Sequence, residues 1–447
     1  SFAAAATLDA RRATIGSDRF RVGFDESTRR REVYEDLVGR LVVYGAGVEA
    51  VAAADRSRAR SLNELLTGTG TTGDPPASAP AEKLPTLEGE DAQQALQEGA
   101  NYLFRTADVT LRKRGAAAPL RADEVAAFAQ TIGSPVLLIQ PVQQQVALLL
   151  VRPSGEVRTE FSPLSLADLL NLVDTVQKQF FIRLVPRGEN EEVEPSPQGD
   201  LDGALKGLWS ALIGPIADSL SEGEPLILVP YREFSLIPFG LLHGPGGRRL
   251  IDLHALSIVP SLATLRALRS RGPWTRTQPV RAYVAGDPAI ALRFLAAGLK
   301  RLPAARAEAE AVTASLKAAG VSEGNIFFRV DNTAHEESYR REARGCDLVH
   351  LACHAKVGVP AYTSCLYFAP YSPYDGMLLA SEVADVRLDD ALVFLSACET
   401  GQGRATADGV IGLGRAFLEA GARAVILSLW KVEDAATAAL SSHFYRA

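Results

Sequence analysis

Two short apolar runs near the end of the chain constrain its fold more than any other feature. The first covers residues 347–355 and leads to His354, and the second covers residues 391–398 and ends at Cys398. Apolar runs of this length that end in a polar residue are typical of buried strands in a parallel sheet. The chain between them is long enough for a helical crossover, so we expect both strand ends at one edge of the same sheet.

From residue 281 onward, predicted strands alternate with predicted helices. Strands that alternate with helices of roughly 10–15 residues form a parallel sheet with helices on both faces. The sequence therefore predicts an α/β fold of three layers with a mostly parallel sheet. Besides the two runs above, strands are expected at residues 281–286, 325–330, 365–368 and 424–429, and helices at residues 305–319, from 333, at 409–420 and from 435. Earlier in the chain, the apolar runs 136–140 and 145–152 are expected to form a pair of strands.

The first 66 residues are helical in character. Apolar residues recur at helical spacing from Arg29 to Tyr44, a glycine-rich break follows, and an alanine- and leucine-rich run extends to Leu66. Two helices with a short link form an αα-hairpin. A hairpin of about 34 residues is also the unit of the tetratricopeptide repeat (TPR), so we expect a terminal TPR-like repeat at residues 1–66, with a plain helical hairpin as the alternative. If the hairpin is such a repeat, further repeats are expected outside this chain, because single repeats rarely stand alone.

Residues 67–86 are rich in glycine, proline, serine and threonine, and this composition predicts a flexible linker. Gly68, Gly70 and Gly73 within it match the spacing of the dinucleotide-binding fingerprint. That fingerprint requires a strand before it and a helix after it, whereas here a helix precedes it and Asp74-Pro75-Pro76 follows. We therefore expect no bound nucleotide and no other cofactor.

Charge and cysteine content narrow the function classes. The net charge of −6 argues against a nucleic-acid-binding face, and no apolar stretch reaches the roughly 20 residues that cross a membrane. The cysteines (Cys346, Cys353, Cys365 and Cys398) are too few and too clustered for the disulfide framework of a secreted protein. We therefore expect the cytoplasm or another reducing intracellular compartment, with no nucleic-acid partner and no membrane. The chain begins without methionine and ends within a helical pattern, so we expect a C-terminally truncated part of a longer protein.

Cys346, His350, Cys353 and His354 resemble a zinc-ligand set in composition only. On a strand, Cys346 and His350 lie about 13 Å apart at about 3.3 Å per residue, which is too far for ligands that bond one zinc ion at about 2.0–2.3 Å. We therefore expect no metal site. His350 is expected to be a hydrogen-bonded core residue, and Cys353 is expected to pack in the core.

His354 and Cys398 fit a cysteine–histidine catalytic pair. A nucleophilic cysteine needs a nearby base or cation that favours the thiolate, and strand ends in an open α/β sheet are where ligands bind. We predict that Cys398 is the nucleophile and His354 the general base, and that the backbone N–H groups of Ala355 and Cys398 form an oxyanion hole. The sequence places no acid to orient the histidine, so the prediction is a dyad. The alternative is that Cys398 is a buried apolar residue.

The two strand-end motifs resemble those of the CHAT domain, a caspase/separase-like family that is often fused to TPR repeats. The resemblance implies a caspase-like fold and a cysteine endopeptidase, with His354 as general base and acid and Cys398 as nucleophile. It also implies a non-catalytic, pseudo-caspase-like part at residues 87–275 and a caspase-like catalytic part at residues 276–447. The similarity spans roughly residues 130–447, and its matching segments are 229–230, 236–239, 302–310, 349–355, 375–376, 395–401, 408–418, 420–422 and 428–432.

One position departs from the family pattern. The residue after the catalytic histidine is typically glycine in the family, whereas here it is Ala355. The N–H group is kept, but the added methyl group narrows the space for a substrate. Two functions are therefore expected. The first is a cysteine peptidase that cleaves a protein or peptide substrate and is recruited or regulated by a protein partner bound to its helical N-terminal region. The second is a catalytically weak or inactive CHAT-domain scaffold.

Three acidic residues lie near the motifs: Asp375, Glu399 and Asp408. Related peptidases select a charged side chain before the scissile bond, so these acids are candidates for a substrate pocket that favours a basic side chain. The alternative is that they are turn and cap residues.

Overall fold

The computed structural model describes most of the chain. The described residues are Ala5 and the ranges 28–58, 120–182, 198–274, 279–296, 298–358, 363–383, 385–397, 404–406, 409–430 and 434–446. The described residues up to Arg271, with residues 405, 406 and 409, form one compact unit, and the other described residues from Gly272 onward form a second. The short strands β13 (Arg404–Thr406) and β14 (Gly409–Ile411) pair with each other. The predicted linker lies outside the described residues, so the predicted domain limits stay predictions.

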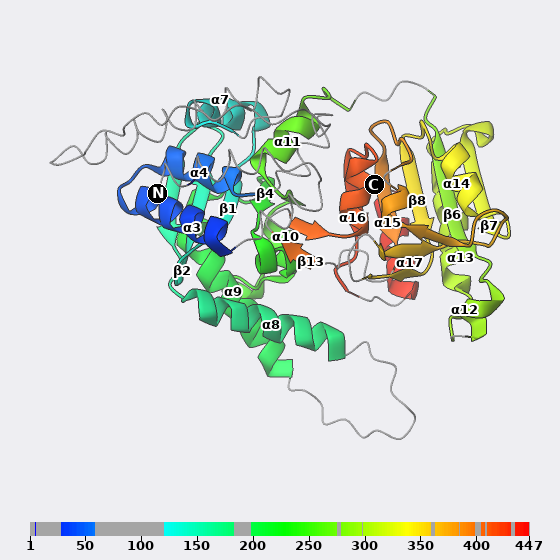
Figure 1. Ribbon diagram of the computed structural model, residues 1–447, viewed down its shortest axis with the longest axis horizontal. Coiled ribbons are helices and arrows are strands. Elements are labelled where there is room, and N and C mark those ends of the chain that lie inside the picture. Colours follow the sequence, from blue (N-terminus) through cyan, green and yellow to red (C-terminus); the bar gives the residue numbers. More distant parts are fainter. Residues whose placement is uncertain are drawn as a thin grey trace. The chain divides into compact units, whose positions relative to one another are not determined.

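The second unit is built on a parallel sheet (Figure 1). Its strand order is β15-β12-β8-β6-β7, and every neighbouring pair runs parallel. The parallel sheet predicted from the sequence is therefore confirmed. The strands are β6 (Ala282–Pro288), β7 (Ile326–Asp331), β8 (Leu348–Ala352), β12 (Leu392–Ser396) and β15 (Ala424–Leu427).

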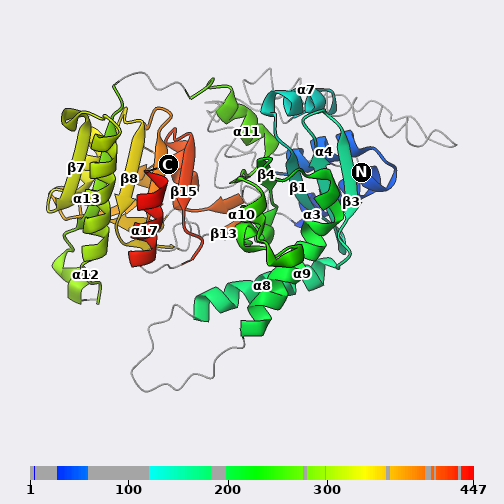
Figure 2. The same cartoon turned by 180° about the vertical axis from the view of Figure 1, so that it is seen from behind.

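Helices cover both faces of this sheet, because successive side chains of a strand point to opposite sides. One face carries α13 (Pro303–Ala318) and α17 (Asp434–Phe444), and the other carries α14 (Glu336–Glu342), α15 (Ala380–Val383) and α16 (Leu413–Glu419). Leu348 of β8 packs in the core of the first face, and Leu351 packs in the core of the second. Figure 2 shows α13 and α17 in front of the strands, so the predicted three-layer α/β fold is confirmed.

The sequence of α13 lets this helix lie close to the sheet. Pro303 stands in the first turn, where its missing N–H group is not needed, and buried residues recur at helical spacing from Ala305 to Val312. Gly286 of β6 faces the helix, and a Cβ atom there would lie 2.5 Å from the carbonyl oxygen of Ala305. This close approach requires glycine.

Short elements follow the strand ends of the second unit. β9 (Ala355–Lys356) comes soon after β8 and pairs antiparallel with β10 (Cys365–Tyr367), which pairs antiparallel with β11 (Met377–Leu379). The strand predicted near Cys365 is therefore confirmed. α12 (Leu292–Ala296) follows β6, and the short helix η5 (Glu323–Asn325) precedes β7.

The first unit contains a mixed sheet in the order β3-β2-β1-β4-β5. β1 pairs antiparallel with β2, and β2 with β3, whereas β1, β4 and β5 run parallel. The pair of strands predicted on either side of residues 140–145 is therefore confirmed. The strands are β1 (Val136–Val142), β2 (Gln145–Val151), β3 (Val157–Phe161), β4 (Leu226–Val229) and β5 (Leu256–Ile258).

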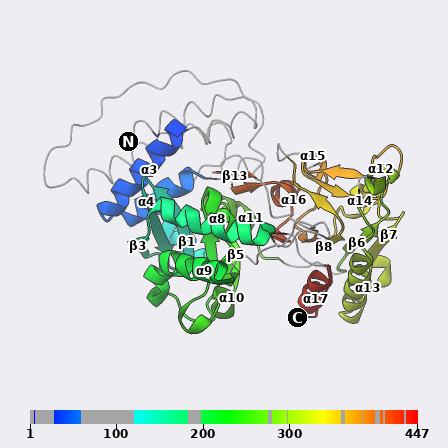
Figure 3. The same ribbon diagram turned by 90° about the horizontal axis from the view of Figure 1, so that it is seen from below.

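Helices also cover both faces of the mixed sheet. Figure 3 shows α3 and α4 above β1, and α9 and α10 below it. One face carries α3 (Thr28–Val43), α4 (Gly47–Arg56), α7 (Ala122–Ile132) and α11 (Leu262–Arg269). The other carries α8 (Leu166–Ile182), α9 (Gln198–Leu212), η1 (Gly214–Ser219), η2 (Arg232–Leu236), η3 (Phe239–Leu241) and α10 (Leu250–Leu253). The exposed turn η4 (Pro245–Gly247) precedes α10.

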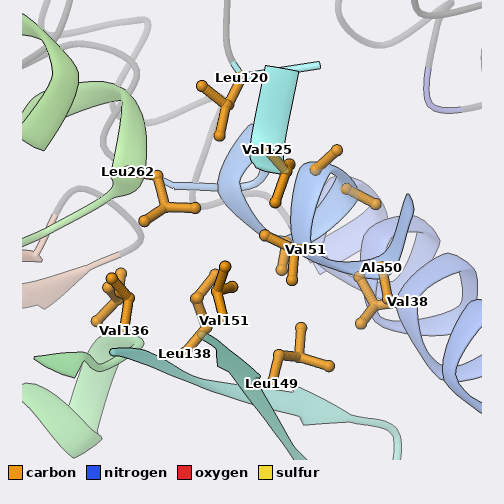
Figure 4. Close-up of a cluster of buried hydrophobic side chains, with 14 of the residues drawn as sticks. Val38, Ala50, Val51, Leu120, Val125, Val136, Leu138, Leu149, Val151 and Leu262 are labelled. Carbon is orange, nitrogen blue, oxygen red and sulfur yellow. The ribbon is translucent and has the colours of Figure 1, made fainter. Parts of the chain in front are cut away.

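The helices α3 and α4 bury their apolar faces against the mixed sheet. Val38 of α3 and Val51 of α4 belong to the same core cluster as Leu138 of β1 and Leu149 of β2, and Figure 4 shows these side chains around one apolar space. The two predicted helices near the N-terminus therefore share a core with the strands that follow them.

Arg58, just after α4, joins neighbouring strands of the mixed sheet. Its buried guanidinium donates to the carbonyl oxygens of Val229 (2.5 Å) and Ile139 (2.8 Å) and to Oε1 of Gln140 (2.8 Å). Val229 is the last residue of β4, and Ile139 and Gln140 belong to β1. Burial lowers the pKa of Arg58 to about 10, so the group remains charged at neutral pH.

Asp55, one turn earlier, caps a helix that follows far along the chain. Its Oδ1 accepts the N–H groups of Leu262 (2.6 Å) and Ala263 (3.2 Å), and its Oδ2 accepts the N–H group of Leu120 (3.3 Å). The first N–H groups of α11 have no partner inside the helix, and a carboxylate stabilises this positive end. Burial raises the pKa of Asp55, and the backbone hydrogen bonds oppose that shift.

α14 begins at a histidine cap rather than at the predicted Thr333. Nδ1 of His335 accepts the N–H group of Ser338 (3.1 Å), whereas the hydroxyl of Thr333 bonds to the backbone of Val330. The ring of His335 stacks on Tyr371, with ring centroids 4.2 Å apart. The rule that favours a small polar cap therefore chose the wrong residue here.

Replacing Arg58 is expected to destabilise the first unit strongly. Arg58→Met keeps an unbranched side chain but leaves three buried acceptors without their donor, so the free energy of unfolding should fall by roughly 3 kcal/mol or more. Urea unfolding measures this loss. Arg40→Met is the matched control, since it removes an exposed ion pair with Asp36 and should cost little. Equal losses in the two variants would contradict the role assigned to Arg58.

The His335 cap is expected to make the stability of the second unit depend on pH. Desolvation lowers the pKa of His335, so near its ordinary pKa of about 6.5 the unfolded state binds more protons than the folded state. The stabilisation is present above that pH and is lost as pH falls through the folded-state pKa. His335→Asn, which keeps a cap that does not titrate, should reduce this acid loss. Unfolding curves over this pH range that are parallel for both proteins would refute the assignment.

Candidate functional site

The predicted site begins at two adjacent strand ends. β8 and β12 pair parallel and in register, from Leu348 opposite Leu392 to Ala352 opposite Ser396. His354 follows Ala352 by two residues, as Cys398 follows Ser396. The predicted neighbourhood of the two strands is therefore confirmed. Cys398, Glu399 and Asp408 lie outside the described residues, so the His354–Cys398 pair stays a prediction.

A main-chain carbonyl group orients His354. Nε2 of His354 lies 2.6 Å from the carbonyl oxygen of Lys300. A carbonyl oxygen can only accept, so Nε2 carries the proton, and Nδ1 is left without one in the neutral ring. The sequence offered no acid for this task, and no side-chain motif could have revealed a main-chain acceptor.

Ala355 follows the histidine in β9. The N–H group of Tyr367 donates to the carbonyl oxygen of His354 (2.9 Å), and Ala355 stands opposite Leu366. This pattern makes Ala355 and Leu366 a non-hydrogen-bonded pair, in which the N–H groups point away from the partner strand. The N–H group of Ala355 is thus directed away from β10, and its predicted part in an oxyanion hole stays a prediction.

Asp375 lies in the turn before β11. Its Oδ1 accepts the N–H group of Met377 (2.9 Å), and its Oδ2 lies 3.3 Å from Nη2 of Arg293 in α12. The Asp375 side chain is 58% exposed, so this is a surface ion pair beside a turn. These bonds agree with the alternative that Asp375 is a turn residue, and its place in a substrate pocket stays a prediction.

A buried polar cluster lies between the same strands and α13. Ser396 of β12 donates to Oε2 of Glu308 in α13 (2.8 Å). Oε1 of Glu308 lies 3.3 Å from Nε2 of His350 in β8, off the line of a hydrogen bond, and Nδ1 of His350 lies 3.1 Å from the hydroxyl of Tyr445. The interpretation of His350 as a hydrogen-bonded core residue is confirmed. Burial, with a smaller contribution from the Glu308 carboxylate, raises the pKa of Tyr445, so the phenol stays neutral.

The described cysteines are buried thiols. Burial raises the pKa of Cys346 to about 12, and burial also raises the pKa of Cys365. Cys353 packs in the core on the side of α14 to α16, as predicted. Cys346 and Cys365 are therefore neutral and poorly reactive at neutral pH, which leaves little competition for a reagent aimed at an accessible thiolate.

Neither a metal-ligand group nor a membrane-spanning helix is found in the part of the chain that the structure describes. Within these ranges, no group of three or more histidine, cysteine, aspartate or glutamate side chains is arranged to hold a metal ion. His350 and Cys353 pack on opposite faces of the sheet. Among the described helices, none is long and apolar enough to span a bilayer.

Two tetratricopeptide repeat proteins match a part of the chain. It is 29% identical over 289 residues to tetratricopeptide repeat protein 28 of Homo sapiens, an alignment that covers 54% of this chain and 11% of that protein. The Mus musculus protein of the same name is 27% identical over 309 residues, covering 58% of this chain and 12% of that protein. The chain thus spans about a tenth of the length of these relatives.

A solved structure and a family model also match the chain. A chain of the Saccharomyces cerevisiae separase–securin complex superposes with a TM-score of 0.41 at 12% identity, covering 97% of this chain and 37% of that chain. The family model of the CHAT domain matches residues 202–447, which is more than half of the chain. The chain therefore belongs to the CHAT-domain family.

Proposed function

We propose that the protein is a cysteine endopeptidase that uses a His354–Cys398 dyad. The observation that carries the proposal is the pairing of β8 and β12 in register, with His354 held through Nε2 by the Lys300 carbonyl oxygen. This bond leaves Nδ1 as the ring atom able to take a proton. The family membership agrees with this chemistry.

The proposed reaction proceeds in two steps through a thioester. Nδ1 of His354 takes the proton of the Cys398 thiol, and the sulfur attacks the carbonyl carbon of the scissile peptide bond. The N–H groups of Ala355 and Cys398 stabilise the oxyanion of the tetrahedral intermediate. His354 then gives its proton to the leaving amine as the C–N bond breaks. In the second step water attacks the thioester, with His354 as base, and releases the carboxylate product and the free thiol.

A scaffold without measurable turnover is the second candidate function. The observation that favours it is Ala355, half-buried against the core of the second unit, at the position where the family typically has glycine. The methyl group narrows the space in front of the proposed oxyanion hole. In this case the protein would bind partners through the same surface without cleaving them.

Partners are proposed from the helical N-terminal region and from the relatives. Two matched relatives are named as tetratricopeptide repeat proteins, and repeats of that kind stack helical hairpins into extended binding surfaces. We propose that a protein partner bound to such a region recruits or regulates the peptidase, and that its substrate is a protein or peptide. A reducing compartment is proposed as well, because a thiolate nucleophile is lost on oxidation.

Labelling of Cys398 by a peptide electrophile tests the dyad. The wild-type chain is expected to label at Cys398, and His354→Ala is expected to reduce the second-order rate constant at least about 100-fold, which is the usual contribution of a general base. Peptide mapping by mass spectrometry identifies the labelled residue, with the buried Cys346 and Cys365 as internal references.

His443→Ala is the matched control for this experiment, since His443 is exposed on α17 and should leave the rate unchanged. Equal labelling rates of the wild-type chain and His354→Ala would refute the proposed dyad and favour the scaffold. Labelling that depends on His354, without cleavage of any peptide in a substrate library, would favour the scaffold as well.

The preference for a basic side chain before the scissile bond is tested with paired probes. Electrophiles that differ only in arginine or leucine at that position are expected to label the wild-type chain at different rates, with arginine favoured. Asp375→Asn should lower the arginine-to-leucine rate ratio about two- to fivefold, because an exposed ion pair contributes little. An unchanged ratio would assign Asp375 to the turn alone and leave the preference to Glu399 and Asp408.

A further inference from the structure

We propose that Asp287 and Arg301 are positioning residues that hold the Lys300 carbonyl oxygen against His354. The inference rests on the proposed function, in which His354 is the general base. Lys300 precedes Arg301 directly in the chain, so whatever fixes the main chain at residue 301 also fixes the Lys300 carbonyl group. We call the Asp287–Arg301 pair the brace.

The brace is a two-point contact on a buried carboxylate. Arg301 donates from Nε to Oδ1 of Asp287 (2.9 Å) and from Nη2 to Oδ2 (2.6 Å). The N–H group of Leu302 donates to the same Oδ1 (2.8 Å), and the Asp287 side chain is 6% exposed. A bidentate pair fixes orientation as well as distance. Together with the Leu302 bond, it holds the main chain of residues 300–302 in place.

The anchor of the brace lies on the strand beside the histidine. Asp287 belongs to β6, and β6 pairs parallel with β8, with Gly286 opposite Ala352. His354 follows β8 by two residues, and its carbonyl partner is tied to β6 through Asp287. The two members of the His354–Lys300 contact are thus held by neighbouring strands of one sheet.

A second carboxylate supports Arg301 from the other side. Asp331, the last residue of β7, bonds to Arg301 and to Arg306 of α13. Asp287 and Asp331 both have positive φ angles, 43° and 51°, a conformation that costs energy in residues other than glycine. Hydrogen bonds with the two aspartates raise the pKa of Arg301, and the bond from Arg301 is the main interaction that lowers the pKa of Asp331. These charges therefore persist over the pH range in which an imidazole titrates.

The contact can be observed by NMR without any activity. In protein labelled with ¹⁵N-histidine, the Nε2–H proton of His354 should give a hydrogen-bonded resonance that exchanges slowly with water, assigned by its loss in His354→Gln. Arg301→Met is expected to lose this resonance. Arg306→Met is the matched control, since Arg306 bonds to Asp331 and Glu310 but not to Asp287, and it should keep the resonance.

Alkylation of Cys398 by iodoacetamide gives a second readout. A thiol paired with an oriented histidine reacts below its ordinary pKa of about 8.5, so at pH 6 Arg301→Met should react at least about tenfold more slowly than the wild-type chain. Arg306→Met should react like the wild-type chain. At high pH, where any accessible thiol is ionised, the rates should converge. The buried Cys346 and Cys365 should stay unlabelled in all variants at pH 6, whereas a general loss of structure would expose them.

Asp287→Asn is the second variant, for the case that Arg301→Met does not fold. Asparagine tolerates the positive φ angle and keeps an acceptor for the Leu302 N–H group, so the charge of the brace is removed with little change in shape. Retention of the His354 resonance in folded Asp287→Asn or Arg301→Met would overturn the proposal, and so would its equal loss in Arg306→Met. If Cys398 of the wild-type chain does not react through His354, the proposed function fails, while the NMR result still decides whether the brace holds the contact.

Discussion

The parallel pairing of β8 with β12 is the interaction on which the second unit depends. Because the pair is in register from Leu348 to Ser396, the side chains of both strands alternate in phase between the two helix layers. One phase supplies the apolar core beneath α14 to α16, and the other meets α13 and α17. The same register places the residues that follow β8 and β12 side by side at one edge of the sheet. One strand pairing therefore sets both the helix layers and the proposed site.

The two sheets use their strand ends in different ways. In the first unit the buried Arg58 bonds to the last residue of β4 and, in β1, to the carbonyl oxygen of Ile139 and the side chain of Gln140. In the second unit the corresponding edge carries His354, which is partly exposed. A buried cation thus occupies one edge, and a partly exposed histidine occupies the other. This contrast agrees with the proposed division into a non-catalytic part and a catalytic part.

The elements with strong side-chain patterns could be predicted from the sequence. The apolar runs of β8 and β12 and the alternation after residue 281 predicted the parallel sheet, because apolar periodicity follows burial. The contacts made by main-chain atoms could not be predicted. The Lys300 carbonyl group has no side-chain signature, and the His335 cap competed with a threonine that local rules prefer. The burial of α3 and α4 on a sheet is a tertiary contact over some 100 residues of sequence, beyond the reach of local pattern.

Because α3, α4 and the mixed sheet share one core, the part of the chain that folds together is longer than the part that matches the family. The family match begins at residue 202, whereas β4 and β5 complete a sheet whose other strands lie at residues 136–161. A gene fragment cut at the start of the match would encode β4 with one edge bare and its apolar surface uncovered. A gene segment that encodes a stable copy of this domain must therefore include the preceding helices and strands. It is longer than the segment that the family model matches.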